Sequence, residues 1–204
     1  MKANKDIIIE FLKNKDNEAE LIEHLKKQNN FYNNSPTKFN KLVDNEYIRL
    51  ILNLIRNSTG KLKYHAIIIL SKMTLNFDSK SFENMCKIAI INSSNKDGNI
   101  RYASRLLIKG IDDLLFLMPL AQEFGKIKNT DIFYESFRSM FYELYDKYNG
   151  EKDIKIKESL SKSLSFVLPR IHDIATFDKD KEEIEIIEKL ASQGVKWKPI
   201  KPFL

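Results

Sequence analysis

The sequence predicts an all-α protein, an α-α superhelix of stacked antiparallel helical hairpins that forms a single domain over residues 1–204. Three observations support this fold class. Apolar residues recur at helical spacing along most of the chain. The chain has 6 Gly and 5 Pro, fewer than strand-rich folds usually need for their turns. Two helical patterns also recur later in the chain in the same order.

Residues 1–43 are expected to form N-terminal capping helices. Asp16 can cap the second of these helices. The polar stretch QNNFYNNSP, residues 28–36, predicts a loop. Ser35 and Pro36 then suit the cap and first turn of a third helix. The apolar faces of the three helices contain Ile7, Ile8, Phe11 and Leu12 in residues 4–14, then Ala19, Leu21, Ile22 and Leu25, and then Phe39, Leu42 and Val43.

Residues 44–170 are expected to hold the helical repeats. The first four helices begin at Asp44, Leu62, Asp78 and Asp97. In the turn NSTG after the first helix, Gly60 takes a helix-stopping position. The second helix is expected to run to Leu75. Asn99 can cap the fourth helix, which covers residues 97–111.

Internal repetition is the strongest sign of a repeat architecture. Residues 47–57 match residues 82–92 at an offset of 35, and residues 66–72 match residues 103–109 at an offset of 37. Two helices that recur in the same order indicate a repeated helical hairpin. A looser third copy contains Phe133, Ser136, Phe137, Met140 and Phe141, then Leu160 and Leu164. Its longer offset requires an insertion, which LMPLAQEFGKIKN (residues 117–129) supplies.

The third copy is unusually aromatic. Aromatic side chains of residues 131–148 cover more than one face of the expected helix. They indicate either a central helix packed on both sides or an exposed aromatic strip that binds a partner. The following helix, residues 154–168, is expected to end at Pro169.

Residues 171–204 are expected to form a C-terminal cap and tail. A charged last helix over residues 178–193 stops at Gly194. The tail VKWKPIKPFL contains two prolines and should be extended. Trp197 and Phe203 either pin this tail onto the last helix or leave it free as a docking peptide.

One segment resembles a known repeat family. It places an acidic residue in a turn, then an apolar–Arg pair, a small residue and two leucines, namely Asp97, Ile100, Arg101, Ala103, Leu106 and Leu107. This pattern resembles the second helix of a HEAT repeat. The resemblance, best over residues 44–117 and weaker over 130–170, implies an armadillo/HEAT-like solenoid. It also implies that Asp97 and Arg101 form hydrogen-bonded ladders between neighbouring repeats. The copy at Ala66 departs from the pattern, with Tyr64 in place of Arg, so an irregular helical bundle remains the alternative fold.

The positive charge is concentrated in the middle of the chain. The whole chain carries +6, and residues 61–110 contain 9 basic and 3 acidic side chains. Arg101, Arg105 and Lys109 fall at i, i+4 and i+8, where they form a basic ridge along one helix. Lys63 and Lys72 occupy the comparable helix one repeat earlier. These five residues are the candidate binding residues, for an acidic protein segment or for nucleic-acid phosphates, and the alternative is a solvated lysine-rich surface.

No motif of the sequence names a reaction, a cofactor or a metal. His24, His65 and His172 lack metal-ligand spacing, and Cys86 lies on an apolar stripe, where a small core residue is expected. Asp112 and Asp113 point about 100° apart on a helix, so they do not form an acid–base pair. The sequence favours a non-catalytic scaffold that binds another protein. Nucleic-acid binding is the alternative, and an enzyme of the helical-repeat DNA glycosylase kind is a third hypothesis.

The sequence also favours a soluble protein of the cytoplasm. Its single cysteine cannot form an intramolecular disulfide, as expected in a reducing compartment. The N-terminus is too polar for a signal peptide, and the apolar runs are far shorter than a membrane span. We therefore expect no membrane partner.

Overall fold

The computed structural model describes residues 5–73, 78–123 and 129–199, and every regular element within these ranges is an α-helix. The predicted all-α fold class is therefore confirmed for the described part of the chain. The helices are α1 (Lys5–Asn14), α2 (Glu18–Asn34), α3 (Pro36–Leu42), α4 (Asn45–Arg56), α5 (Gly60–Leu70), α6 (Ser79–Ser93), α7 (Gly98–Glu123), α8 (Asp131–Gly150), α9 (Ile154–Asp178) and α10 (Lys181–Ser192).

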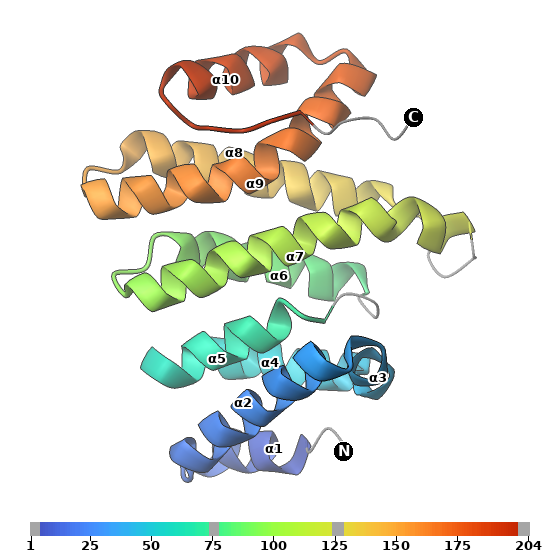
Figure 1. The fold of residues 1–204 in the computed structure, drawn as a ribbon, viewed down its shortest axis with the longest axis vertical. Helices are drawn as coiled ribbons and strands as arrows, with labels where there is room; N and C mark the ends of the chain where they lie inside the picture. The colour runs from blue at the N-terminus through green and yellow to red at the C-terminus, as the bar shows by residue number, and fades with distance from the viewer. Residues whose placement is uncertain (1–4, 74–77, 124–128, 200–204) are drawn as a thin grey trace.

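The helices form two layers (Figure 1). Helices α2, α5, α7 and α9 lie in the front layer of this view, with α1, α4, α6 and α8 behind them. Each front helix packs on the next, and α4 and α5, α6 and α7, and α8 and α9 also pack as pairs. Helix α10 covers the end of the stack by packing on α9.

The front-layer helices share one direction. Helices α5, α7 and α9 all begin at the left edge in Figure 1, whereas α4, α6 and α8 return from right to left behind them. The N-terminal ends of successive front-layer helices are therefore neighbours along one edge of the molecule. This arrangement brings together residues that are far apart in the sequence.

Apolar side chains from both layers form one continuous core. Tyr47, Ile51 and Leu54 of α4 are fully buried, as are Ala66 and Leu70 of α5. Burial of each large apolar side chain contributes about 1.5–3 kcal/mol, so these periodic apolar faces are the main reason that the helices pack. Of the aromatic residues of α8, Phe133, Phe137, Phe141 and Tyr148 are buried, Tyr134 and Tyr145 are partly buried, and Tyr142 is 36% exposed. The structure therefore favours the packed helix over the exposed aromatic strip.

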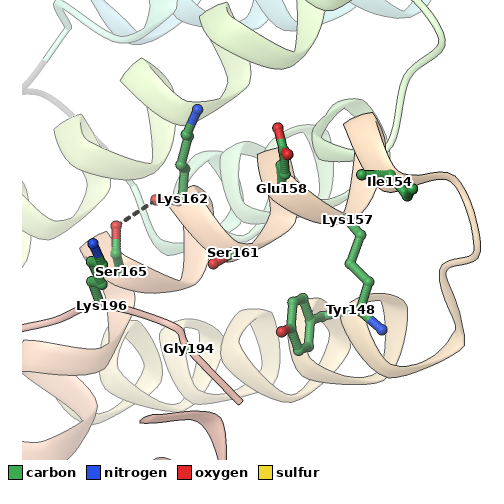
Figure 2. A pocket seen from close by; sticks show the side chains of 9 residues that line it. All are labelled: Tyr148, Ile154, Lys157, Glu158, Ser161, Lys162, Ser165, Gly194 and Lys196. Atoms are coloured by element: carbon green, nitrogen blue, oxygen red, sulfur yellow. Dashed lines mark hydrogen bonds between the residues drawn. The ribbon is translucent and has the colours of Figure 1, made fainter. Parts of the chain in front are cut away.

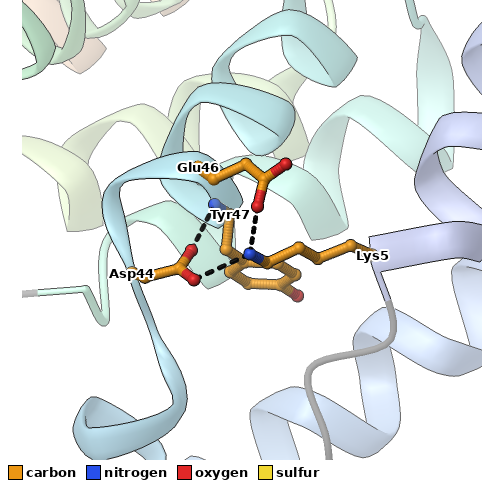
Figure 3. Close-up of polar contacts among 4 residues, drawn as sticks. All are labelled: Lys5, Asp44, Glu46 and Tyr47. Carbon is orange, nitrogen blue, oxygen red and sulfur yellow. Dashed lines mark hydrogen bonds and ion pairs between the residues drawn. The ribbon is translucent and has the colours of Figure 1, made fainter.

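Aspartate side chains start several of the helices. Asp44, Asp78, Asp153 and Asp180 each precede a helix and accept a backbone N–H of its first turn. Asp44 Oδ1 accepts from Tyr47 N at 2.8 Å, while Asp44 Oδ2 pairs with Lys5 Nζ at 2.7 Å. Lys5 also pairs with Glu46, so one lysine joins the start of α1 to the start of α4 (Figure 3).

Gly110 marks the closest approach between α5 and α7. A Cβ atom at this position would lie 2.6 Å from the backbone carbonyl oxygen of Ser71, just after α5 ends. Real side chains do not come so close to backbone oxygen, so only glycine lets the two helices meet here. The expected helix to Leu75 instead ends at Leu70, where Ser71 Oγ donates to the carbonyl of Ile68; residues 74 and 75 lie outside the described residues.

The loop predicted for residues 28–36 was wrong, because α2 continues to Asn34. Gln28 is buried, and the rings of Phe31 and Tyr32 lie 6.4 and 5.5 Å from the ring of Phe39 in α3. These contacts stabilise a helix that local polarity disfavours. Ser35 and Pro36 do start α3 as predicted, although the Ser35 side chain makes no cap hydrogen bond.

Two prolines lie inside helices, and the helix end predicted at Pro169 was wrong. Helix α9 passes through Pro169 to Asp178, and α7 passes through Pro119 to Glu123. A proline removes one helical hydrogen bond and bends the helix, and α9 bends toward α10 in its second half (Figure 1). Burial of Ile171 and Ala175 beyond the bend stabilises the continuation of α9. The insertion expected over residues 117–129 is therefore helical up to residue 123, and residues 124–128 lie outside the described residues.

Three expected helix ends also differ in detail. Asn17, not Asp16, precedes α2, and its φ of 62° turns the chain sharply after α1. Helix α4 ends at Arg56 and Gly60 begins α5, so this glycine starts a helix instead of stopping one. Asp97, not Asn99, caps α7, since Asp97 Oδ1 accepts from Asn99 N at 2.8 Å. In each case the sequence located the turn correctly, but a different residue of that turn marks the helix boundary.

The C-terminal segment is docked as far as the structure describes it. Gly194 follows α10 with a φ of 91°, as expected for a helix stop. Val195 is buried, and the Trp197 ring lies 5.0 Å from the His172 ring. Trp197 therefore contacts α9, while Val195 N donates to the carbonyl of Leu190 in α10, and Phe203 lies outside the described residues.

Candidate basic binding surface

A basic hollow lies between the N-terminal halves of α7 and α9. Its volume is about 270 Å³. Four cationic side chains and one carboxylate line it, together with two small residues: Arg101, Arg105, Lys155, Lys162, Glu158, Gly98 and Ser159. Residues 101 and 155 are far apart in the sequence, and the shared direction of α7 and α9 brings them together.

The two arginines of this hollow are held by neutral acceptors. Arg101 Nη1 donates to the carbonyl oxygens of Asn95 and Lys96, at 2.7 and 2.9 Å, in the turn before its own helix. Arg105 Nη1 donates to Ser159 Oγ at 2.8 Å across to α9. Asp97 and Arg101 do not form the expected hydrogen-bonded ladder between repeats. Both side chains bond instead at the α6–α7 turn.

The close arginines also influence each other. Partial burial, followed by the positive charge of Arg101, lowers the pKa of Arg105 from its usual range. Burial disfavours the charged form of a side chain, and a neighbouring cation adds to that effect. Within the described residues, no carboxylate forms an ion pair with any of the four cations that line the hollow.

A second and larger hollow of about 610 Å³ lies on the other side of α9. It is lined by Tyr148 at the end of α8, by one side of α9, and by Gly194 and Lys196 of the C-terminal segment (Figure 2). Ile154 at its rim is 75% exposed, and Lys157 Nζ lies 4.9 Å from the centre of the Tyr148 ring. The larger hollow therefore combines apolar and cationic groups.

The two hollows share the exposed crest of α9. Glu158 and Lys162 line both of them. In Figure 2, Lys162 points away from α8, while Lys157 points toward Tyr148. We call the two hollows and the crest between them the α7–α9 surface. Its cations are Arg101, Arg105, Lys155, Lys157, Lys162 and Lys196, and Glu158 is the one carboxylate among its lining residues.

The structure brings together only part of the basic set chosen from the sequence. Arg101 and Arg105 lie in the same hollow, and Lys109, further along α7, is exposed outside it. Lys63 is half-buried on α5 and lines neither hollow. Lys72 lies past the C-terminal end of α5, with its Nζ 5.3 Å from the centre of the Tyr32 ring of α2. The ridge over both repeats is therefore replaced by a cluster at one edge.

Sequence reasoning missed Lys155, Lys157 and Lys162. All three lysines lie in IKIKESLSK, the first nine residues of α9. It lies in residues 111–204, which carry 15 basic and 17 acidic side chains. The net charge of that region therefore conceals this local group of lysines. A pairing of equivalent helix starts between α7 and the third copy would have placed these lysines beside Arg101.

Other reactive side chains have structural surroundings. Cys86 is buried in α6, and burial raises the pKa of its thiol, as expected for a core residue. Asp112 pairs with Arg170 Nε at 3.0 Å, and the neighbouring Asp113 is exposed. Within the described residues, no three His, Cys, Asp or Glu side chains are grouped so that they could hold a metal ion.

Comparison with protein-family models, with curated proteins and with solved structures finds no match for the chain. None of the helices in the described ranges is both long enough and apolar enough to cross a membrane. Function must therefore be inferred from the α7–α9 surface itself.

Proposed function

We propose that the chain is a non-catalytic protein-interaction scaffold, a HEAT-like solenoid of stacked helical hairpins. Two features support this architecture. The helix pairs α4–α5 and α6–α7 coincide with the two copies that recur at offsets of 35 and 37 residues. Helices α8 and α9 then repeat the same two-layer arrangement (Figure 1). In this proposal, residues 1–43 and 171–204 cap the two ends of the repeats, and the protein acts in the cytoplasm.

We further propose that the scaffold binds an acidic segment of a partner protein on the α7–α9 surface. The observation that carries this proposal is the absence, in the described residues, of ion pairs for the six cations of this surface. Unpaired cations that face solvent attract an anionic partner and speed its association. Lys155, Lys162 and Lys196 are exposed, and no ion pair within the described residues explains why they gather here.

Nucleic acid is the second candidate partner. Six cations on one surface also suit phosphate contacts, and each such contact makes binding more sensitive to salt. The apolar part of the larger hollow favours a protein partner, because a phosphate backbone offers no apolar side chain to bury there. Tyr148 is 7% exposed and already contacts Lys157, so it does not offer a free ring on which bases could stack.

Fluorescence anisotropy with two labelled probes of equal length tests the proposal. The probes are a glutamate-rich peptide and a single-stranded DNA. We expect the peptide to bind more tightly at moderate salt, and binding to weaken as salt rises. Tighter binding of the DNA, with a steep salt slope, would establish the nucleic-acid alternative instead.

A charge-swap variant and a matched control locate the site. Lys155→Glu with Lys162→Glu changes two exposed lysines of the α7–α9 surface, and peptide binding is expected to be lost. Lys38→Glu with Lys41→Glu changes two exposed lysines of α3 by the same net charge. If the two double variants weaken binding equally, the attraction comes from overall charge and not from this surface.

A further inference from the structure

The two hollows differ in chemistry, and this difference specifies the partner more closely. The smaller hollow is lined by Arg101 and Arg105 of α7 and by Lys155 of α9. The larger hollow presents the exposed apolar side chain of Ile154, beside a Tyr148 ring that Lys157 covers. A ligand that filled only one of the two hollows would leave the lining residues of the other exposed to water.

We propose that the partner is an acidic peptide segment with a large apolar side chain next to its carboxylates, a proposal that rests on the function proposed above. The carboxylates occupy the smaller hollow and pair with Arg101, Lys155 and Lys162. The apolar side chain packs into the larger hollow against Ile154. The segment therefore crosses the crest of α9, and both hollows are filled at once.

Charge complementarity selects this occupant. Guanidinium and ammonium groups without carboxylate partners bind carboxylates in charge-assisted hydrogen bonds. Arg101 and Arg105 already use part of their donors on neutral acceptors, so their planes are fixed before a ligand arrives. Such preorganisation lowers the entropy that binding must overcome.

Glu158 gives the surface a means of selection. It stands on the crest that both hollows share, and within the described residues no cation forms an ion pair with it. A partner segment must therefore avoid a carboxylate at the point where it crosses α9, because like charges held close together repel. A segment with carboxylates on one side of α9 and an apolar residue on the other keeps carboxylates away from Glu158 better than a uniform acidic run does.

The exposed isoleucine offers a sharp test of the apolar contact. Ile154 is 75% exposed and Ile91, on α6 in the back layer, is 66% exposed, so serine substitutions at both leave the core intact. Ile154→Ser is expected to weaken binding of an acidic peptide with a phenylalanine anchor by about tenfold. Ile91→Ser is the matched control and should leave that affinity unchanged.

Three peptides of equal length complete the design. The first is acidic with a phenylalanine anchor, the second is acidic with serine at the anchor, and the third has the anchor with glutamines in place of glutamates. We expect the first to bind more tightly than either of the others, and Ile154→Ser to remove its advantage over the second. Glu158→Gln should tighten both acidic peptides by a few fold, because it removes a repulsive charge.

The outcomes separate this inference from the proposed function. If the two acidic peptides bind equally well and Ile154→Ser has no effect, the anchor is wrong while the acidic-partner function stands. If single-stranded DNA of the same length binds more tightly than every peptide, the protein-binding function is wrong and the inference is overturned with it. If no peptide responds to Lys155→Glu with Lys162→Glu, the α7–α9 surface is not the binding site.

Discussion

Arginine side chains in two regions of the molecule have opposite surroundings. On the α7–α9 surface, Arg101 and Arg105 are partly buried beside other cations and bond to neutral oxygens. At the junction of α8, α9 and α10, Arg138 Nη2 pairs with Asp178 at 2.6 Å and with Glu183 at 3.1 Å. Arg138 joins three helices, whereas the first two arginines leave their charge available to a ligand.

The difference is one of counter-charge. Glu183 has a side chain only 1% exposed, so its charge is tolerated because Arg138 lies beside it. Burial raises the pKa of Glu183 despite that cation. Residue type and net charge therefore do not separate a structural arginine from a binding one, whereas the neighbouring carboxylates do.

Removing the buried pair should have the largest effect. Arg138→Ala leaves Glu183 buried without its cation and is expected to lower the free energy of unfolding by about 2 to 3 kcal/mol at neutral pH. Denaturant unfolding followed by circular dichroism measures this loss. Arg138→Ala combined with Glu183→Gln should recover part of it, because a neutral amide needs no cation.

The pH dependence of that loss has a definite sign. A carboxyl whose pKa is raised in the folded state destabilises the fold above that raised pKa, and the cost disappears below its ordinary value of 4.5. The difference between Arg138→Ala and the wild type should therefore shrink as the pH falls through the raised pKa toward 4.5. A loss that is constant with pH would mean that Arg138 acts by packing alone.

The effect of breaking the Arg138–Glu183 ion pair can be compared with that of disturbing an uncharged contact, the close approach of Gly110 to Ser71. Gly110→Ala places a Cβ against the Ser71 carbonyl and should cost about 1 to 3 kcal/mol, because the α5 and α7 backbones must separate. Gly150→Ala is the control, since nothing lies within 4 Å of its added Cβ, and it should be neutral or slightly stabilising. Equal effects at the two sites would contradict the close approach.

An ion pair that is exposed should have a smaller effect. Asp44→Ala removes the cap of α4 and the pair with Lys5 (Figure 3), and we expect a loss of about 1 kcal/mol near neutral pH. The hydrogen bond from Lys5, and then that from Tyr47 N, lowers the pKa of Asp44. The stability that this carboxylate provides is present above its ordinary value of 3.8 and is lost as the pH falls through the lowered pKa. The wild type and the variant should therefore converge in acid, which unfolding curves at several pH values would show.

The unpaired cations should have the smallest effect on stability. Lys155→Glu with Lys162→Glu is expected to change the free energy of unfolding by less than about 0.5 kcal/mol per site, because both side chains are exposed and have no ion-pair partner. Relief of repulsion near Arg101 and Arg105 should make the change slightly favourable. A marked loss in thermal unfolding would place these lysines with the structural arginines and weaken the comparison.

Much of the fold follows from local patterns in the sequence. The helices from Asp44 onward have apolar faces at helical spacing, and side chains such as Ile51, Ala66 and Leu107 are buried as that spacing requires. The helix at residues 28–34 could not be predicted, because its polar residues are stabilised by a contact with Phe39 that the local sequence does not reveal. Pro169 was misleading for the same reason, since α10 packs on the far half of α9.

Only the α7 half of the candidate site could be predicted from the sequence. Arg101 and Arg105 fall on one side of a helix, so their spacing alone identifies them. Lys155 and Lys162 join them only because α7 and α9 run in the same direction and begin at the same edge. The buried Glu183 was also missed, because its cation lies 45 residues earlier in the chain.

The shared direction of α5, α7 and α9 has a further electrostatic consequence. Each helix carries a macrodipole with about half a positive charge at its N-terminus, and three such ends lie along one edge of the molecule. Part of the positive potential at that edge therefore belongs to the backbone. Acetylation of every lysine on the surface, or titration of those lysines at high pH, would leave this part in place. The antiparallel helices α4, α6 and α8 bring their carbonyl ends to the same edge in the back layer, so the backbone makes the front layer positive and the back layer negative along this edge.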